Sequence, residues 1–244
     1  MCSIVVTFNE NRERTLKEMA QAVRHRGPDS FEVWTNGRHG VAACRLVIFG
    51  DPVARMIYQH GSITILLNGE IYNYSELWDE LRSRGLYPKT DLESELIAVL
   101  FQTYGLRFAA KLKGMFAIAI LQDSQLVLAR DRFGIKPLYY ARTGHKVIVS
   151  SEIKGVLKHP DVTPILNPTA LEETMVFGYV YSRSETFFQG IYQVPPGAAL
   201  EFADGGTYTQ LDFGELPSAR YLNETQAIDY GEAVQETRQQ LINA

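Results

Sequence analysis

The sequence predicts a layered α+β fold. Short apolar runs, rich in β-branched and aromatic residues and bounded by turn residues, alternate with amphipathic segments of helical period. The order is strands, helices, strands and then a helix, which favours packed layers over a strict βαβ repeat. The 244 residues are enough to bury a full core without disulfides or metals.

Strands are expected wherever a short apolar run lies between turn residues. The expected strands are Cys2–Phe8, Gly40–Ile48, Ser62–Leu67, Met115–Leu121, Gln125–Ala129, Pro137–Arg142 and Lys146–Ser150. Asp123-Ser124, between two of these runs, is typical of a hairpin turn. The first strand begins with a cysteine directly after the initiator methionine, which is an unusual place for a thiol.

Helices are expected where apolar residues recur at helical spacing. The expected helices are Arg14–Val23, Ser75–Arg84, Leu92–Tyr104 and Pro168–Phe177. Ser75 is the expected N-cap of the second helix, with Gly85 at its C-terminal end. Asn167 caps the fourth helix, and Pro168 takes its first position.

The composition excludes several function classes. Apolar residues make up 45% and charged residues 21%, as in ordinary globular proteins. A net charge of −4 gives no support for nucleic-acid binding. No apolar run is long enough to span a membrane, and the N-terminus has no basic signal-peptide region. Cys2 and Cys44 form neither a disulfide framework nor a zinc motif, so we expect a cytoplasmic protein.

Cys2 is a candidate nucleophile. If Met1 is removed, the α-amino group of Cys2 lies close to its own sulfur, and such an amine has a pKa of about 7.7–8.0. N-terminal nucleophiles use this amine as their base, so no histidine is needed. A cysteine at position two can also be accidental. Acyl transfer further requires an oxyanion hole and a group that holds the substrate.

Two short stretches offer those further groups. Asn68-Gly69 follows the expected strand Ser62–Leu67 and is typical of a type I′ hairpin turn. An amide side chain beside a glycine N–H also has the composition of an oxyanion hole. Arg45, near the end of a strand, is suited to binding a carboxylate in bidentate fashion. Taken alone, it is equally consistent with a surface arginine.

Seven stretches occur together in one order: MCSIV, RHRGPDS, RLVIFGD, LNGEIYNY, LKGMFAIAI, RDRFGIKPLYY and SSEIKGVL. In this order they closely resemble the glutaminase domain of glutamine-hydrolysing asparagine synthetases. That domain is a class II glutamine amidotransferase and an N-terminal nucleophile hydrolase. The resemblance runs from Met1 to about Phe213. It implies a four-layer α/β/β/α sandwich in which two largely antiparallel sheets are flanked by helices.

The resemblance also implies roles for individual residues. Cys2 matches the nucleophile, and Asn68 with Gly69 matches the oxyanion-hole pair. Arg45 matches the residue that binds the glutamine α-carboxylate. The remaining implied pocket residues are Ile48 and Phe49, whose backbone lines the pocket, and Glu70 and Glu93 near the substrate amino group. Arg130, Asp131 and Arg132 are expected to be structural ions paired beside the core.

Two departures from the family pattern leave an alternative open. Ser3 stands where the family has glycine, and it adds a Cβ beside the nucleophile. Glu93 stands where the family has aspartate, and its carboxylate reaches one methylene further. The alternative to a glutaminase is therefore a docking or regulatory module with an impaired glutamine pocket. A third option keeps the chemistry and changes the amide substrate.

A phosphate-binding motif is missing. The family's synthetase domain carries Ser-Gly-Gly-x-Asp-Ser, and this sequence has no such stretch. We therefore expect residues 1–213 to be the glutaminase domain and 214–244 to be a linker and the first helix of a separate synthetase domain, about Thr225–Ala244. The expected partners are L-glutamine and a synthetase domain or subunit that accepts ammonia. No cofactor is expected in this chain, because ATP and Mg²⁺ belong to the synthetase. Self-association into a homo-oligomer stays open, and the sequence does not name the final acceptor.

Overall fold

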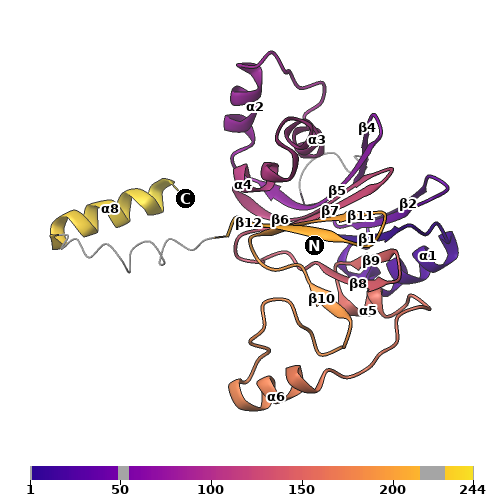
Figure 1. Ribbon diagram of the computed structural model, residues 1–244. Coiled ribbons are helices and arrows are strands. Elements are labelled where there is room, and N and C mark those ends of the chain that lie inside the picture. Colours follow the sequence, from indigo (N-terminus) through magenta and orange to yellow (C-terminus); the bar gives the residue numbers. More distant parts are fainter. Residues whose placement is uncertain (1, 49–54, 215–228, 244) are drawn as a thin grey trace. The chain divides into compact units, whose positions relative to one another are not determined.

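The computed structural model describes residues 2–48, 55–214 and 229–243 (Figure 1). The chain falls into two compact units, Met1–Gly214 and Glu215–Ala244. The second unit contributes one described helix, α8 (Tyr230–Asn243). The sequence predicts this helix over Thr225–Ala244, and residues 225–228 and 244 lie outside the described part. Among the described residues, no helix is both long and apolar enough to cross a lipid bilayer.

The first unit contains two antiparallel sheets of six strands each. One sheet, here called sheet A, has the order β10-β8-β9-β1-β3-β2. Its strands are β1 (Ser3–Phe8), β2 (Ser30–Thr35), β3 (Gly40–Arg45), β8 (Tyr139–Thr143), β9 (Lys146–Ser150) and β10 (Ile191–Gln193). Strand β1, which begins directly after Cys2, therefore lies inside this sheet, between β9 and β3.

The other sheet, sheet B, has the order β12-β11-β7-β6-β5-β4. Its strands are β4 (Ile57–His60), β5 (Ile63–Ile71), β6 (Gly114–Gln122), β7 (Gln125–Arg130), β11 (Ala198–Ala203) and β12 (Tyr208–Asp212). Asp123 and Ser124 form the predicted hairpin turn between β6 and β7. Strand β5, which carries Asn68 and Gly69, lies inside the sheet between β4 and β6.

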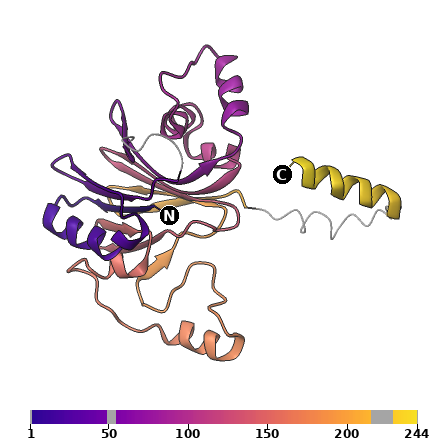
Figure 2. The same cartoon turned by 180° about the vertical axis from the view of Figure 1, so that it is seen from behind.

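Helices cover the outer face of each sheet (Figures 1 and 2). Sheet A packs on α1 (Glu13–Ala22) and α5 (Ile153–Val156), while sheet B packs on α2 (Tyr74–Arg82), α3 (Glu93–Tyr104) and α4 (Phe108–Lys111). Single 3-10 turns, η1 (Arg24–Arg26) and η2 (Gly105–Arg107), follow α1 and α3. A third apolar core fills the space between the two sheets. The predicted four-layer sandwich is therefore confirmed.

Helix α6 (Pro168–Phe177) begins where the sequence predicts. The Asn167 side chain accepts a hydrogen bond from the Ala170 N–H at 3.5 Å, and Pro168 takes the first position. The helix ends at Gly178, whose φ of 81° is a left-handed conformation that glycine adopts without strain. Only Ala170 of this helix is buried.

Two local predictions were wrong. Asn68-Gly69 is not a turn, because both residues are paired with β6 inside β5. A Cβ on Gly69 would overlap the carbonyl oxygen of Met115, so this glycine allows the two strands to approach closely. Helix α2 begins at Tyr74 with Asn73 as its N-cap, so Ser75 already belongs to the helix.

The expected ion pairs around Arg130 and Asp131 were also wrong in kind. The Arg130 guanidinium donates to the backbone carbonyls of Gly134 at 2.8 Å and Lys136 at 2.9 Å. Asp131 accepts hydrogen bonds from the backbone N–H groups of Phe133, Ile135 and Lys136. Arg130 also donates to Gln193 Oε1 and the Val194 carbonyl, so its bonds join the loop between β7 and β8 to the end of β10.

Candidate active site

Cys2 and Arg45 come from neighbouring strands of sheet A. Ser3 is paired with Cys44, and this register continues to place Cys2 opposite Arg45. Residues directly opposite each other in antiparallel strands share one face of the sheet. Cys2 packs against the core between the sheets, so this face looks toward sheet B. Its Sγ lies 3.7 Å from the carbonyl oxygen of Leu46, directly after Arg45.

Asn68 comes from the facing sheet. Its strand neighbour Leu66 and its cross-strand partner Ala117 both belong to the core between the sheets, so Asn68 lies on the inner face of sheet B. Strands β1 and β5 lie against each other across this layer. Asn68 is 2% exposed, and its Nδ2 makes no hydrogen bond to the described residues. Because buried donors are nearly always paired, this amide is a strong candidate for an oxyanion donor.

A cradle of hydrogen bonds fixes the backbone around Cys2. The Arg26 side chain, 8% exposed, donates its Nε–H to the Cys2 carbonyl at 3.2 Å and its Nη1–H to Glu152 at 3.0 Å. The Ile4 N–H donates to Ser151 Oγ at 2.9 Å. These residues had no predicted role. The one sequence feature that could have identified them is that they lie within the family-like stretches RHRGPDS and SSEIKGVL.

Ser3 points away from the nucleophile. As residues two apart in β1, Ser3 and Val5 share a face of sheet A, and Val5 belongs to the core between sheet A and its helices. Ser3 is fully buried, and its Oγ donates to the Val23 carbonyl at 3.5 Å. The extra Cβ at this position therefore does not crowd the Cys2 thiol.

The backbone after Arg45 is held by Asp29. The Asp29 N–H donates to the Arg45 carbonyl at 3.0 Å, and Asp29 Oδ2 accepts the Val47 N–H at 2.7 Å. Ile48, the next predicted pocket residue, is exposed. Phe49, also predicted to line the pocket, lies outside the described residues. Asp29 is a further residue without a predicted role.

Glu93 and Glu70 lie at the end of β5. The first residue of α3 is Glu93, and its Oε1 accepts the Ile71 N–H at 2.6 Å. Burial raises the pKa of Glu93 to about 7, with a contribution from the negative charge of Glu70, although the Ile71 N–H opposes the shift. By strand alternation, the exposed Glu70 lies on the same face as Asn68. Two neighbouring carboxylates favour a bound cation such as an ammonium group.

The loop before Glu93 is anchored by a buried carboxylate. Glu95 is almost fully buried and accepts the N–H groups of Lys89 and Thr90 at 3.0 and 2.6 Å. It also accepts the Thr90 hydroxyl at 2.7 Å. This anchor sets the start of α3 and therefore the position of Glu93.

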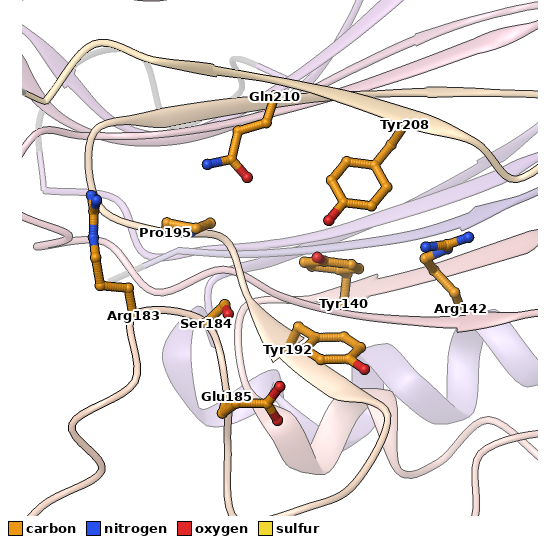
Figure 3. Close-up of a pocket in the computed structure, with 9 residues that line it drawn as sticks. All are labelled: Tyr140, Arg142, Arg183, Ser184, Glu185, Tyr192, Pro195, Tyr208 and Gln210. Atoms are coloured by element: carbon orange, nitrogen blue, oxygen red, sulfur yellow. The ribbon is translucent and has the colours of Figure 1, made fainter.

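A separate hollow of about 420 Å³ lies between the edge strands of the two sheets (Figure 3). It is lined by Tyr140, Arg142, Arg183, Ser184, Glu185, Tyr192, Pro195, Tyr208 and Gln210. The Arg142 guanidinium lies 5.4 Å from the ring centre of Tyr208 and donates to the Gly206 carbonyl at 2.7 Å. None of the predicted site residues lines this hollow, which lies along the β10 and β12 edges and not beside Cys2.

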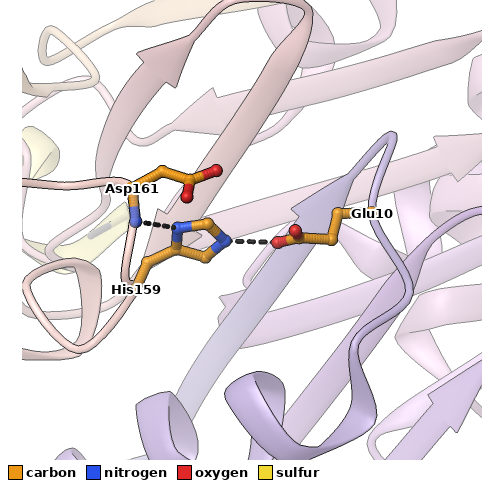
Figure 4. A group of neighbouring side chains, drawn as sticks. All are labelled: Glu10, His159 and Asp161. Carbon is orange, nitrogen blue, oxygen red and sulfur yellow. Dashed lines mark hydrogen bonds and ion pairs between the residues drawn. The ribbon is translucent and has the colours of Figure 1, made fainter.

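Glu10, His159 and Asp161 form a second polar group (Figure 4). The Lys146 ammonium donates to Glu10 at 2.9 Å and to Asp161 at 2.6 Å, so it supplies the positive charge that these carboxylates need. His159 accepts the Asp161 N–H at Nδ1 and donates from Nε2 to Glu10. Burial opposes ionisation of Glu10, but bonds from His159 and Lys146 hold its pKa below the usual value. The group is therefore an ion-pair network that joins three segments.

Comparisons with known proteins agree with this geometry. A family model described as a glutamine amidotransferase domain matches residues 1–212. Asparagine synthetases 1 and 2 of Bacillus subtilis are similar to this chain, with 34% identity over 86% of it and 36% over 76%. The matches cover only 34% and 26% of those relatives, so the chain spans about a third of their length or less.

A solved structure shares the fold. Glutamine phosphoribosylpyrophosphate amidotransferase from Bacillus subtilis superposes with a TM-score of 0.59 at 18% identity, over 87% of this chain and 49% of that one. The two facing antiparallel sheets, the inward-facing Cys2 and the family match lead to one assignment. This chain belongs to the class II glutamine amidotransferase domain family.

Proposed function

We propose that this chain hydrolyses the side-chain amide of L-glutamine and supplies the ammonia to an ATP-dependent, asparagine-synthetase-like partner. One observation carries the proposal. Asn68 Nδ2 is a buried donor without a hydrogen bond to the described residues, on the sheet face that looks toward Cys2. A developing oxyanion is the group that such a donor would stabilise.

The first half of the reaction forms a thioester. Removal of Met1 frees the α-amine of Cys2, which takes the proton from the thiol. The sulfur then attacks the amide carbon of glutamine, and the oxyanion that forms is stabilised by Asn68 and the Gly69 backbone. The amine passes its proton to the leaving nitrogen, the C–N bond breaks, and ammonia departs. The bond from Arg26 to the Cys2 carbonyl keeps the nucleophile in position.

The second half releases glutamate. A water molecule attacks the γ-glutamyl thioester while the α-amine accepts its proton. The C–S bond then breaks, and the proton returns to the sulfur. Arg45 holds the substrate α-carboxylate, while Glu93 and Glu70 hold its ammonium group. This half-reaction needs no cofactor, since ATP and Mg²⁺ act in the synthetase that consumes the ammonia.

The rival function, a docking or regulatory module, rested on Ser3 and Glu93. Ser3 faces the helices that cover sheet A, where it is bonded to Val23 and points away from Cys2, and this weakens the first support. Whether Glu93 impairs glutamine binding is tested by the assay below. We also propose that the protein acts in the cytoplasm, because a reducing compartment keeps the Cys2 thiol available, and both cysteines are free.

The test is release of glutamate and ammonia from glutamine by the purified chain. We expect turnover that Cys2→Ala abolishes and that Asn68→Ala lowers by about 10²–10³-fold. Asn73→Ala is a matched control, because its buried amide is already bonded to Lys111 and Lys113. It should lower thermal stability and leave kcat unchanged. A folded chain that releases no glutamate would overturn the proposal and leave the docking module or a different amide substrate.

A further inference from the structure

The hollow of Figure 3 lies where the layer between the two sheets reaches its edge. Tyr140 and Tyr192 are paired across β8 and β10, and both pack on the core between the sheets. Tyr208 of β12 is paired with Phe202 of the same core, so it also lies on an inner face. The volume of about 420 Å³ falls in the range of pockets that bind small molecules.

The three tyrosines give this hollow firm aromatic walls. The ring centres of Tyr140 and Tyr192 are 5.6 Å apart, and those of Tyr140 and Phe202 are 5.4 Å apart. Phe202 in turn contacts Tyr208, with ring centres 5.3 Å apart. These are the distances of packed aromatic pairs, and further flat rings pack well on such walls. Figure 3 shows the hydroxyl groups of Tyr140 and Tyr208 pointing toward each other inside the hollow.

Two arginines, Arg142 and Arg183, bring positive charge to the same hollow. Each is fixed by one backbone carbonyl: Arg142 donates to Gly206 at 2.7 Å, and Arg183 donates to Pro196 at 2.9 Å. Within the part of the chain that the structure describes, neither guanidinium forms an ion pair with a carboxylate. A guanidinium has five N–H donors and binds anionic oxygens in bidentate fashion, so each one has donors left for an anion.

One carboxylate, that of Glu185, also lines the hollow. It accepts the Asn167 side-chain N–H at 3.0 Å and forms no ion pair with the described residues. The two guanidinium groups outnumber it, so the lining is positive overall. The hollow therefore favours an anionic ligand, and the Glu185 charge weakens the binding of such a ligand.

We infer that this hollow binds a small organic anion that carries a flat ring. The ring packs among the three tyrosines, and Arg142 binds the anionic group. The Arg142 guanidinium lies 5.4 Å from the ring centre of Tyr208, so the charged and the aromatic parts of the site adjoin. The anionic group is a carboxylate or a phosphate, because a guanidinium binds the oxygens of both. Glutamine has no flat ring, so this ligand differs from the substrate proposed for the Cys2 site.

Calorimetric titration of the full chain with four probes tests the inference. AMP joins a flat ring to a phosphate, and indole-3-acetate joins a flat ring to a carboxylate. Adenosine has the ring without the charge, and inorganic phosphate has the charge without the ring. At least one of the two ring anions should bind one-to-one with a Kd below about 1 mM. Adenosine and inorganic phosphate should each bind at least tenfold more weakly.

The stronger of the two ring anions identifies the anionic group as phosphate or carboxylate. The inference is overturned if neither ring anion binds with a Kd below about 1 mM. It is also overturned if adenosine or inorganic phosphate binds as tightly as the better ring anion, because the site would then not require ring and charge together.

Three variants assign the binding to the hollow. Arg142→Gln should weaken the binding of the better ring anion at least tenfold. Arg84→Gln is the matched control, because Arg84 also lies over a tyrosine ring, that of Tyr104 at 5.0 Å, but just after α2 and outside the hollow. It should bind the anion like the parent. Glu185→Gln should tighten binding by about threefold, the size of a weakly screened charge interaction.

The assignment fails if Arg142→Gln binds the anion as tightly as the parent, or if Arg84→Gln weakens binding to the same extent. Thermal unfolding shows whether Arg142→Gln, which loses its bond to Gly206, still folds. If it does not, Glu185→Gln decides alone, since damage to the fold cannot strengthen binding. Tighter binding then supports the site, and unchanged or weaker binding overturns it.

Discussion

The Michaelis constant for glutamine should fall as the pH rises from 6 to 8. Glu93 has a pKa of about 7, because it is buried and lies near the negative charge of Glu70. Only its ionised form attracts the substrate ammonium. About one molecule in eleven is ionised at pH 6 and about ten in eleven at pH 8. The KM should therefore fall by about tenfold over this range.

The assay is the initial rate of glutamate release between pH 5.5 and 8.5 at constant ionic strength. Separate values of kcat and KM are needed, because the Cys2 amine also titrates near neutral pH. Ionisation of that amine changes the fraction of active nucleophile, whereas Glu93 changes binding. Glu93→Gln should give a KM that no longer varies with pH. At pH 8 its KM should exceed that of the parent by about tenfold or more, as for the loss of a charged hydrogen bond.

Two results would refute this reasoning. A parent KM that does not change between pH 6 and 8 would mean that Glu93 does not face the substrate. A Glu93→Gln variant that keeps the parent's pH dependence would assign the titration to another group, and Glu70→Gln would then be tested in the same way.

Further predictions concern the same site. Glu93→Asp should lower the KM for glutamine, because the shorter carboxylate restores the family spacing; unchanged or weaker binding would show a pocket adapted to glutamate. Glu93→Gln should stabilise the folded chain by on the order of 3 kcal/mol at pH 8, because the pKa rises from 4.5 to about 7. Folded Glu93 binds its proton more tightly than unfolded Glu93, so its penalty is absent below about pH 4.5 and complete above about pH 7. Thermal unfolding at pH 4 and pH 8 tests this, and an equal gain at both would contradict it. Ser3→Gly should leave kcat and KM within about twofold, and a large gain in kcat would show that Ser3 crowds the thiol.

The inner strands could be predicted from the sequence because local and tertiary preferences agree there. Strand β1 is a run of apolar and β-branched residues, and it is buried on both faces. Strand β11 (Ala198–Ala203) was missed because alanine, leucine and glutamate are good helix formers. Its pairing with β7 and β12 outweighs that preference, and this pairing cannot be read from the segment alone.

The Asn68-Gly69 pair shows the same limit in the site. Its local chemistry indicates a hairpin turn, but pairing with β6 holds it inside a strand. The oxyanion-hole assignment rests on the residue types, an asparagine followed by a glycine. It therefore does not depend on whether the pair lies in a turn or in a strand.

The supporting residues could not be predicted, because their roles depend on long-range contacts. Arg26 is one of three basic residues in the stretch Arg24-His25-Arg26, and nothing local distinguishes it. A 3-10 turn buries it between the Cys2 carbonyl and Glu152, which is 126 positions away in the chain. Asp29 is equally ordinary in sequence and gains its role from the strand end at Arg45.

The most direct test of the central claim compares two preparations of this chain, one with Met1 removed and one with Met1 retained, each assigned by intact mass. If the α-amine of Cys2 is the base, only the preparation without Met1 should release glutamate from glutamine at a substantial rate. A chain that keeps Met1 and hydrolyses glutamine equally fast would contradict the self-activated N-terminal nucleophile.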